Sequence, residues 1–147
     1  MIKAVVERKR LVNTCSPFTL PVRVYYEDTD AGGVVYHSNY LKFMERGRTE
    51  FLRCLGYDQH QLIKQKCLFV VADCSVRFRR PGRLDDKLQV NTWLESTGKV
   101  RLVFRQSISC GEQLLCEGTF TVGSVHSDTM RPAVILEELR NKCLMMI

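Results

Sequence analysis

The sequence has no long apolar stretch. No run reaches the ~18 consecutive apolar residues of a membrane-spanning helix, and the basic, mixed segment of residues 1–20 lacks the apolar core of about 7–15 residues that a signal peptide needs. From these two absences we expect a cytoplasmic protein that does not insert into a membrane.

Paired cysteine motifs are absent as well. The seven cysteines form an odd set without a CxxC pair, so neither a disulfide framework nor a zinc knuckle fits the pattern. Free cysteine is among the most buried residue types. We therefore expect reduced, mostly buried thiols and no metal site.

Long runs of one charge sign are also missing. Lys and Arg outnumber Asp and Glu by 22 to 16, which gives a net charge of +6, but the basic residues are scattered. The excess leaves nucleic acid, membrane surfaces and phosphorylated small molecules open as partners. The absence of a basic run argues against a polyanion-binding arm and leaves a local phosphate contact open.

The residues that are present are typical of one folded domain. The chain has 147 residues, enough for a single core, and its content of 45% hydrophobic and 26% charged residues argues against disorder. It has no internal repeat, linker or low-complexity tract. We therefore expect one compact unit.

A short strand and a long helix are predicted first. Residues 22–26 alternate between apolar and other positions, which predicts a half-buried strand with Tyr26 facing inward. Apolar residues then recur with helical spacing over residues 40–55, and Gly56 ends the pattern. Gly47 lies inside this helix at a cost of about 1 kcal/mol relative to Ala, so we expect a neighbouring surface to approach its backbone.

Four strands are predicted after the helix. Residues 69–78 form the first, and alternating apolar residues predict three more over residues 88–122, with hairpin turns at residues 97–98 and 110–111. A short C-terminal helix is predicted at about residues 134–144. Hairpin connections imply an antiparallel sheet with the long helix on one face, an α+β fold. Such a sheet leaves an edge open, so we expect a homo-oligomer.

Titratable and flexible residues crowd the entrance of the long helix. Residues 25–52 read YYEDTDAGGVVYHSNYLKFMERGRTEFL. This stretch closely resembles the D-x-D-x-x-G-x-V loop and following N-Y pair of hotdog-fold acyl-CoA thioesterases in the 4-hydroxybenzoyl-CoA thioesterase family, and the Tol-Pal-associated bacterial branch is the most similar. A looser likeness continues through residues 69–86, FVVADCSVRFRRPGRLDD, and covers roughly residues 21–133 in all.

The resemblance implies a hotdog fold, in which a five-stranded antiparallel sheet wraps around one long central helix. It also implies assembly as a homodimer or homotetramer, and hydrolysis of acyl-CoA to free acid and CoA without a metal or organic cofactor. Acyl carrier protein is an alternative carrier to CoA. We accordingly expect a single thioesterase domain at residues 21–147 and an N-terminal extension of unassigned role at residues 1–20.

Asp30, the second aspartate of the loop, is the catalytic residue that the resemblance indicates. Thioester hydrolysis needs a base or nucleophile beside the carbonyl carbon and donors on the carbonyl oxygen, and a loop carboxylate and free helix N-terminal N–H groups supply these. In the family the backbone N–H at the position of His37 polarises the thioester, and Tyr26 corresponds to a tyrosine beside the acid. Direct attack by Asp30 and general-base activation of water both stay open, as do a turn-capping role for Asp30 and a core role for Tyr26.

The loop and a basic turn are the expected substrate contacts. Two adjacent glycines permit positive φ and close approach of a ligand. Coenzyme A carries phosphates, so its site needs cationic groups, although a solvated basic turn would look the same in the sequence. The expected contact residues are Gly32, Gly33, Val34, Tyr36, Arg79, Arg80 and Arg83.

Three further carboxylates have other expected roles. We interpret Asp28 as mainly structural, because it can orient the loop or bond its amides. Glu45 is expected either to support the site through another side chain or to be a buried polar partner on the helix. Glu50 is expected to be solvated or ion-paired.

Two other functions stay open. A non-catalytic module that binds acyl thioesters or nucleic acid would use the positive charge and exposed aromatics such as Trp93, but no RNP-like motif is present, so we expect no nucleic-acid partner. A hotdog dehydratase would share the fold and place its histidine in another sequence setting. Short aliphatic, aromatic and long acyl groups all remain open as substrates.

Overall fold

The computed structural model describes residues 16–147, so most of the predicted extension at residues 1–20 lies outside the described residues. The predicted order of a strand, a long helix, four strands and a short C-terminal helix is confirmed. In chain order the elements are β1 (Phe18–Arg23), the 3-10 helix η1 (Tyr26–Asp28), α2 (His37–Cys54), α3 (Gln59–Lys64), β2 (Cys67–Phe78), β3 (Lys87–Thr97), β4 (Arg101–Cys110), β5 (Gln113–His126) and α4 (Glu137–Leu144).

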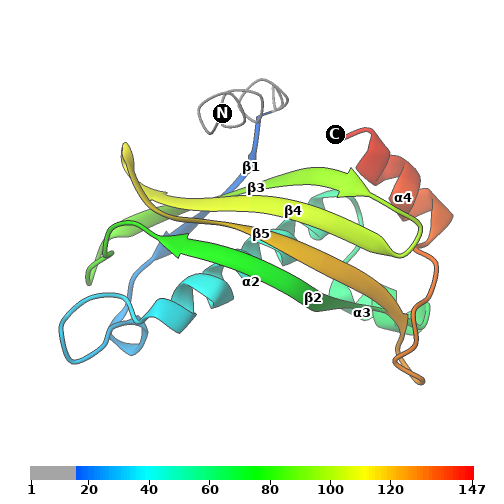
Figure 1. The fold of residues 1–147 in the computed structure, drawn as a ribbon, viewed down its shortest axis with the longest axis horizontal. Helices are drawn as coiled ribbons and strands as arrows, with labels where there is room; N and C mark the ends of the chain where they lie inside the picture. The colour runs from blue at the N-terminus through cyan, green and yellow to red at the C-terminus, as the bar shows by residue number, and fades with distance from the viewer. Residues whose placement is uncertain (1–15) are drawn as a thin grey trace, which may run out of the picture.

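One antiparallel sheet holds all five strands, in the order β1-β3-β4-β5-β2. Hairpins join β3 to β4 and β4 to β5, and Gly111 in the second turn has a φ of 59°, a conformation that glycine adopts without steric cost. The sheet curves over α2, which runs along one of its faces (Figure 1). The predicted α+β hotdog architecture is confirmed.

α2 is held against the sheet by one face of buried side chains that recur with the helical period. Its stop signal also works as expected, because Gly56 follows the helix with a φ of 95°. The apolar residues of α2 that are buried against the sheet are Tyr40, Phe43, Met44, Phe51 and Leu52.

Gly47 marks the closest approach between α2 and the sheet. A Cβ at this position would lie 2.9 Å from Thr92 Oγ1 and 3.0 Å from both Gln106 Nε2 and Val90 Cγ1. Real Cβ atoms essentially never come within 3.0 Å of a neighbouring heavy atom, so the sheet leaves no room for a side chain here. The prediction that a neighbouring surface approaches Gly47 is confirmed.

A buried amide links α2 to β3 and β4 at the same place. Gln106 on β4 is fully buried, and its Nε2 donates to Met44 O and Thr92 Oγ1, both at 2.8 Å. Its Oε1 accepts a hydrogen bond from Arg48 Nη1 at 2.9 Å. The helix carbonyl, the strand hydroxyl and the guanidinium thus satisfy the polar atoms of Gln106 in a region closed to water.

The helix covers the sheet unevenly. α2 packs mainly against β1, β3 and β4. Paired residues of an antiparallel sheet point to the same face, and on β2 Val71 pairs with the buried Val122 and Phe78 with the buried Cys116. Nevertheless, Val71 is 50% exposed and Phe78 is 52% exposed. The inner face of β2 is therefore open within the described part of the chain.

Two elements differ from the prediction. β1 ends at Arg23, so the predicted strand through Tyr26 is wrong; the chain turns there into η1. α3 was not predicted, although a capping box marks its start: Asp58 Oδ1 accepts from Gln61 N at 2.7 Å, and Gln61 Oε1 accepts from Asp58 N at 3.3 Å. A helix this short has too few residues to show a periodic apolar pattern.

The six cysteines of residues 16–147 are all free, as expected. The expectation that they are mostly buried is wrong, because only three of the six, Cys67, Cys116 and Cys143, are buried. Burial raises the pKa of Cys116 to about 12 and that of Cys143 to about 11, so both stay protonated thiols near neutral pH. Within the same residues, the structure contains no helix with the length and apolar character needed to cross a membrane.

The Gly47→Ala substitution tests the close approach of α2. Alanine favours a helix by about 1 kcal/mol over glycine, but its Cβ would displace the hydrogen-bonded ends of Thr92 and Gln106. We expect a net loss of about 1–3 kcal/mol in the free energy of unfolding, measured by urea denaturation.

Gly98→Ala is the matched control. The nearest atom to a Cβ at Gly98 is 3.8 Å away, so the change in the free energy of unfolding should stay within ~0.5 kcal/mol. A Gly47→Ala variant as stable as the wild-type protein would contradict the crowding at α2.

Candidate active site

Asp28 joins the loop of residues 28–36 to the entrance of α2. Its backbone oxygen accepts hydrogen bonds from Tyr36 N at 2.9 Å and from Asn39 Nδ2 at 2.8 Å. Asp28 as a whole residue is only 7% exposed, and its carboxylate Oδ2 accepts a hydrogen bond from Tyr25 N at 2.8 Å. These bonds agree with the structural role expected for Asp28, since its side chain is occupied by the backbone.

Asp30 lies at the open end of the same loop. Its N–H donates to Val34 O at 2.9 Å, and its Oδ1 accepts from Gly32 N at 2.8 Å. Gly33, with a φ of 77°, closes the turn. Asp30 is exposed, and its Oδ2 has no hydrogen-bond partner within residues 16–147. One carboxylate oxygen thus caps the turn, and the other is available to a ligand.

The first turn of α2 presents free hydrogen-bond donors. The N-cap residue Tyr36 provides no side-chain cap, and in the part of the chain that the structure describes the backbone N–H groups of His37 and Ser38 have no acceptor. No acidic residue lies in this turn, so the positive end of the helix dipole is uncompensated. This entrance is therefore suited to stabilise negative charge on a bound oxygen.

Aromatic rings surround the exposed side chain of His37. The ring centroid of His37 lies 4.4 Å from that of Tyr36 and 6.2 Å from that of Phe78, which comes from the end of β2. Tyr40, one turn further along α2, packs against Phe78 with centroids 5.8 Å apart. The helix entrance is thus apolar on the side that faces β2.

A buried tyrosine fixes the turn after β2 against this entrance. Tyr40 Oη accepts a hydrogen bond from Gly82 N at 2.9 Å, and Gly82 O accepts from Val35 N at 2.8 Å. A Cβ on Gly82 would lie 3.2 Å from Val35 Cγ2, so only glycine fits here without displacement. Burial raises the pKa of Tyr40, which keeps its phenol neutral.

Tyr26 does not face inward in this chain, contrary to the prediction. The strand ends three residues earlier, and η1 leaves the Tyr26 side chain 82% exposed. Its backbone oxygen accepts from Thr29 N at 3.2 Å and Thr29 Oγ1 at 2.9 Å, which holds the chain in its turn. The alternating pattern predicted a strand that is too long, because the backbone here forms the hydrogen bonds of a turn instead of those between strands.

The basic turn lies next to the loop, since a β-bridge pairs Arg83 with Val34. Arg79, Arg80 and Arg83 are all exposed. Arg79 Nη2 donates to Glu117 Oε1 at 2.7 Å, whereas Arg80 and Arg83 have no ion pair within residues 16–147. The structure thus brings Arg83, one of the predicted phosphate contacts, next to Val34 in the loop, and Arg80 and Arg83 are the two arginines of this turn without an ion pair in the described part of the chain.

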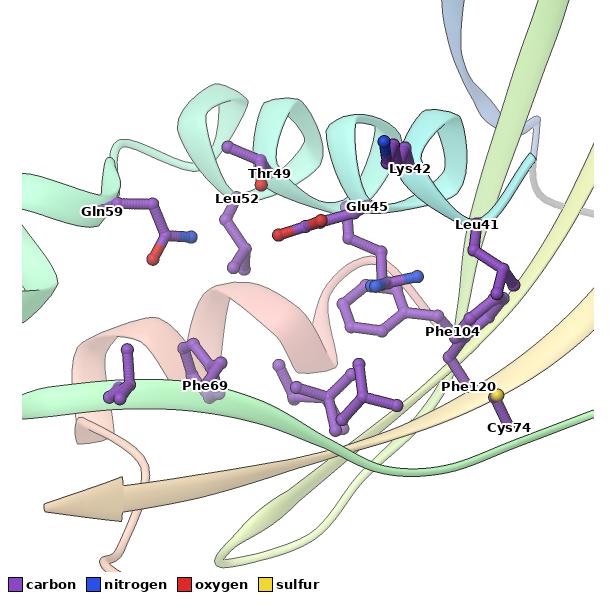
Figure 2. Close-up of a pocket in the computed structure, with 15 residues that line it drawn as sticks. Leu41, Lys42, Glu45, Thr49, Leu52, Gln59, Phe69, Cys74, Phe104 and Phe120 are labelled. Atoms are coloured by element: carbon purple, nitrogen blue, oxygen red, sulfur yellow. The ribbon is translucent and has the colours of Figure 1, made fainter. Parts of the chain in front are cut away.

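The two helix glutamates differ from each other. Glu50 forms an ion pair with Arg53, as expected. Glu45 is exposed, so the alternative of a buried polar partner is wrong, and the alternative of a supporting residue stays a prediction. Figure 2 shows its carboxylate pointing from α2 into the space between the helix and β2.

That space is a cavity of about 550 Å³. Labelled side chains of α2 line one wall in Figure 2, Phe69 and Cys74 of β2 line another, and Phe104 and Phe120 lie between the helix and β2. Neither this cavity nor a second one of about 370 Å³ beside β1 is lined by Asp30 or His37. The lining residues of the larger cavity are Leu41, Lys42, Glu45, Arg48, Thr49, Leu52, Gln59, Leu68, Phe69, Val71, Cys74, Leu102, Phe104, Phe120 and Val122.

Arg48 is the cavity residue that sequence reasoning missed. It follows Gly47 within the apolar stripe, and its offset of eight from Tyr40 places it on the buried face of α2. An arginine at a buried helical position was the available signal. No three His, Cys, Asp or Glu side chains of residues 16–147 come together as a metal site.

The chain matches the model of the Thioesterase-like superfamily over residues 24–143. It is 40% identical over 124 residues to "Acyl-CoA thioesterase YbgC" of Haemophilus influenzae, covering 84% of this chain and 91% of that protein. It is 45% identical over 119 residues to "Acyl-CoA thioester hydrolase YbgC" of Escherichia coli O6:H1, covering 80% and 89%. The crystal structure of a probable thioesterase from Bartonella henselae is similar, with a TM-score of 0.77, 33% identity, and coverage of 80% of this chain and 98% of that one.

The Tyr40→Phe substitution tests the anchor between α2 and the turn after β2. Loss of the hydroxyl leaves the buried Gly82 N–H without its acceptor, which costs about 1–3 kcal/mol of unfolding free energy. We also expect faster amide hydrogen exchange at Gly82, measured by NMR. Unchanged exchange at Gly82, together with unchanged stability, would contradict the anchor.

Proposed function

We propose that the chain hydrolyses the thioester of acyl-CoA at the entrance of α2, between Asp30 and the first N–H groups of the helix. The chain belongs to the thioesterase-like superfamily and acts as an acyl-CoA thioesterase. The products are a free acid and CoA. This activity sets aside a non-catalytic binding module and a dehydratase.

One observation carries the choice of site. The free N–H groups of His37 and Ser38 and the free Oδ2 of Asp30 lie at one end of the molecule, on a loop and a helix that Asp28 joins. Negative charge grows on the carbonyl oxygen in the tetrahedral transition state, and donors that are already in place stabilise it without reorganisation. The uncompensated helix dipole adds to this stabilisation.

Two routes fit this arrangement. In the first, the Asp30 carboxylate attacks the carbonyl carbon, CoA leaves as the thiolate, and water hydrolyses the mixed anhydride. In the second, the carboxylate takes a proton from a water molecule as that water attacks the carbonyl. Both need the Asp30 side chain ionised, and both place the developing oxyanion at the His37 N–H.

Neighbouring residues complete the proposed site. The backbone of Gly32 and Gly33 permits close approach of the thioester, while Val34, Tyr36 and the His37 ring border it. We propose that Tyr26 acts next to Asp30 when another protein surface covers its ring, which is exposed in the single chain.

We propose that Arg80 and Arg83 bind the phosphates of CoA. Both are exposed, neither has an ion pair among residues 16–147, and Arg83 pairs with the loop at Val34. Arg79 contributes less, because Glu117 already engages its guanidinium. The same cations suit the phosphate of an acyl carrier protein, which we propose as an alternative carrier.

We further propose that the working enzyme is a homo-oligomer built on a dimer. β2 is a 12-residue edge strand, and the inner side of its edge is open at Val71 and Phe78. A second copy of β2 would satisfy the free backbone groups of this edge. We also propose that the protein is cytoplasmic. Its association with the Tol-Pal system is proposed from the resemblance of the loop alone.

Asp30→Asn tests the catalytic carboxylate. Asparagine keeps an oxygen that accepts from Gly32 N, so the turn and the fold should persist, but the basic and nucleophilic group is lost. We expect kcat for release of CoA thiol from acyl-CoA to fall about 10²- to 10⁴-fold.

Asp128→Asn is the matched control for that experiment. Asp128 is exposed, has Lys66 as its one ion-pair partner among residues 16–147, and lies in the turn after β5, so its substitution should leave hydrolysis unchanged. Undiminished hydrolysis by Asp30→Asn would remove Asp30 from the mechanism.

Val71→Asp tests the dimer. An unpaired carboxylate buried between two copies of β2 should raise the dimer dissociation constant at least ~100-fold, measured by analytical ultracentrifugation over a dilution series. Gln113→Asp, at the exposed start of β5, should leave the constant unchanged. A monomeric wild-type protein at micromolar concentration would contradict this assembly.

A further inference from the structure

Arg48 is the one arginine that lines the larger cavity within the described residues, and it is only 8% exposed. Its guanidinium carbon lies 4.3 Å from the centroid of the Phe120 ring, which also lines the cavity. Burial lowers the pKa of Arg48, and the charge of Glu45 partly offsets this effect. A desolvated cation therefore lies in the wall of an apolar pocket.

The hydrogen bonds of Arg48 are incomplete. Nη1 donates to Gln106 Oε1 at 2.9 Å, and within residues 16–147 no carboxylate lies within 4.0 Å of the guanidinium. A guanidinium has five N–H donors, so most of them lack a protein acceptor. None of its nitrogens is a fully enclosed, unsatisfied atom, so the unused donors border accessible space. A ligand oxygen in the cavity would satisfy them.

The charges around the cavity favour an anion. Lys42 and Arg48 supply two cations among its lining residues, and Glu45 supplies the single acidic group. The volume of about 550 Å³ lies within the usual range of ligand pockets, and most of the other lining residues are apolar. The lining residues thus provide an apolar surface suited to an alkyl chain and carry a net positive charge.

The cavity begins beside the proposed thioester site. Leu41 lies one helical turn after His37 on the same face of α2, and Cys74 lies on the same face of β2 as Phe78, which contacts the His37 ring. The Arg48 side chain leans toward the start of α2, so its guanidinium lies about 12 Å along the axis from His37 N. An extended chain of roughly ten bonds spans that distance.

We propose that this cavity binds the acyl chain and that Arg48 selects chains of medium length that end in a carboxylate. The inference rests on the proposed function, because the thioester must lie at the entrance of α2 for its chain to reach Arg48. A planar guanidinium with free donors binds a carboxylate through two parallel hydrogen bonds, whereas a terminal methyl group leaves those donors unsatisfied. Arg48 is then a specificity residue for the reaction.

Two substrates of equal chain length test the inference. Sebacoyl-CoA carries a ten-carbon chain with a distal carboxylate, and decanoyl-CoA ends in a methyl group. Wild-type protein should show the higher kcat/KM with sebacoyl-CoA. Arg48→Met should lower this kcat/KM about 10- to 100-fold, mostly through KM, and should change that of decanoyl-CoA much less.

Arg105→Met is the matched control. Arg105 also stacks on an aromatic ring, with its guanidinium carbon 3.9 Å from the centroid of Trp93, but it is on β4 and lines neither cavity. Its loss should leave the preference between the two substrates unchanged. Because Arg48→Met also removes a partner of Gln106, Arg48→Lys serves as a second variant: it keeps the charge, loses the planar fork, and should lower the preference for sebacoyl-CoA.

The results distinguish a failure of selection by Arg48 from a failure of the proposed thioesterase function. Hydrolysis of decanoyl-CoA by the wild-type protein with rejection of sebacoyl-CoA would overturn the selection by Arg48 and leave the thioesterase intact. An equal loss on both substrates in both Arg48 variants would also overturn it, since a purely structural role gives that result. Failure of the wild-type protein to hydrolyse acyl-CoA of any length would instead contradict the proposed function.

Discussion

The two hydrogen bonds that Asp28 O accepts, from Tyr36 N and Asn39 Nδ2, position the whole candidate site. They join the loop to the first turn of α2 at a point that is closed to water, where each lost bond leaves a buried polar group unsatisfied. Asp30 lies on the same loop, so these bonds also fix the position of Asp30 relative to the start of α2. Without them, the Asp30 carboxylate would not be held in one position.

The second constraint is the close contact of α2 with one part of the sheet. Gly47 lets the helix come very near to β3 and β4, and α2 packs mainly against β1, β3 and β4 rather than against β2. The uncovered inner face becomes the cavity, and the uncovered edge becomes the surface on which we propose a second copy pairs. Arg48, next to Gly47, lies at the border between the two regions.

Much of this fold was predictable because its signals are local and repeated. The helical stripe of α2, the alternation of β2 to β5 and the glycine turns each recur over many residues, and the structure confirms them. The crowding at Gly47 was also predictable, since a glycine that interrupts a buried stripe needs a reason. The loop motif led to Asp30 and His37 through a resemblance, and their catalytic roles stay proposals.

The remaining features depend on packing that no short stretch of sequence contains. Tyr26 was predicted to face inward because it continues an alternating pattern, but turn bonds at Thr29 end the strand before it. Glu45 was predicted to be buried, and the uneven placement of α2 leaves it facing the cavity instead. The acyl preference belongs to this class too, since it depends on which side chains of α2 and β2 share a space.

The proposed catalysis depends on binding of the thioester oxygen by the first backbone N–H groups of α2. The most direct measurement is an NMR titration of the protein with a non-hydrolysable acyl-CoA ketone, followed through the backbone amides. The account predicts that the His37 and Ser38 amide protons show the largest downfield shifts and become protected from exchange, as donors do when they gain an acceptor. Unchanged amides at these two residues, with the largest shifts elsewhere, would contradict it.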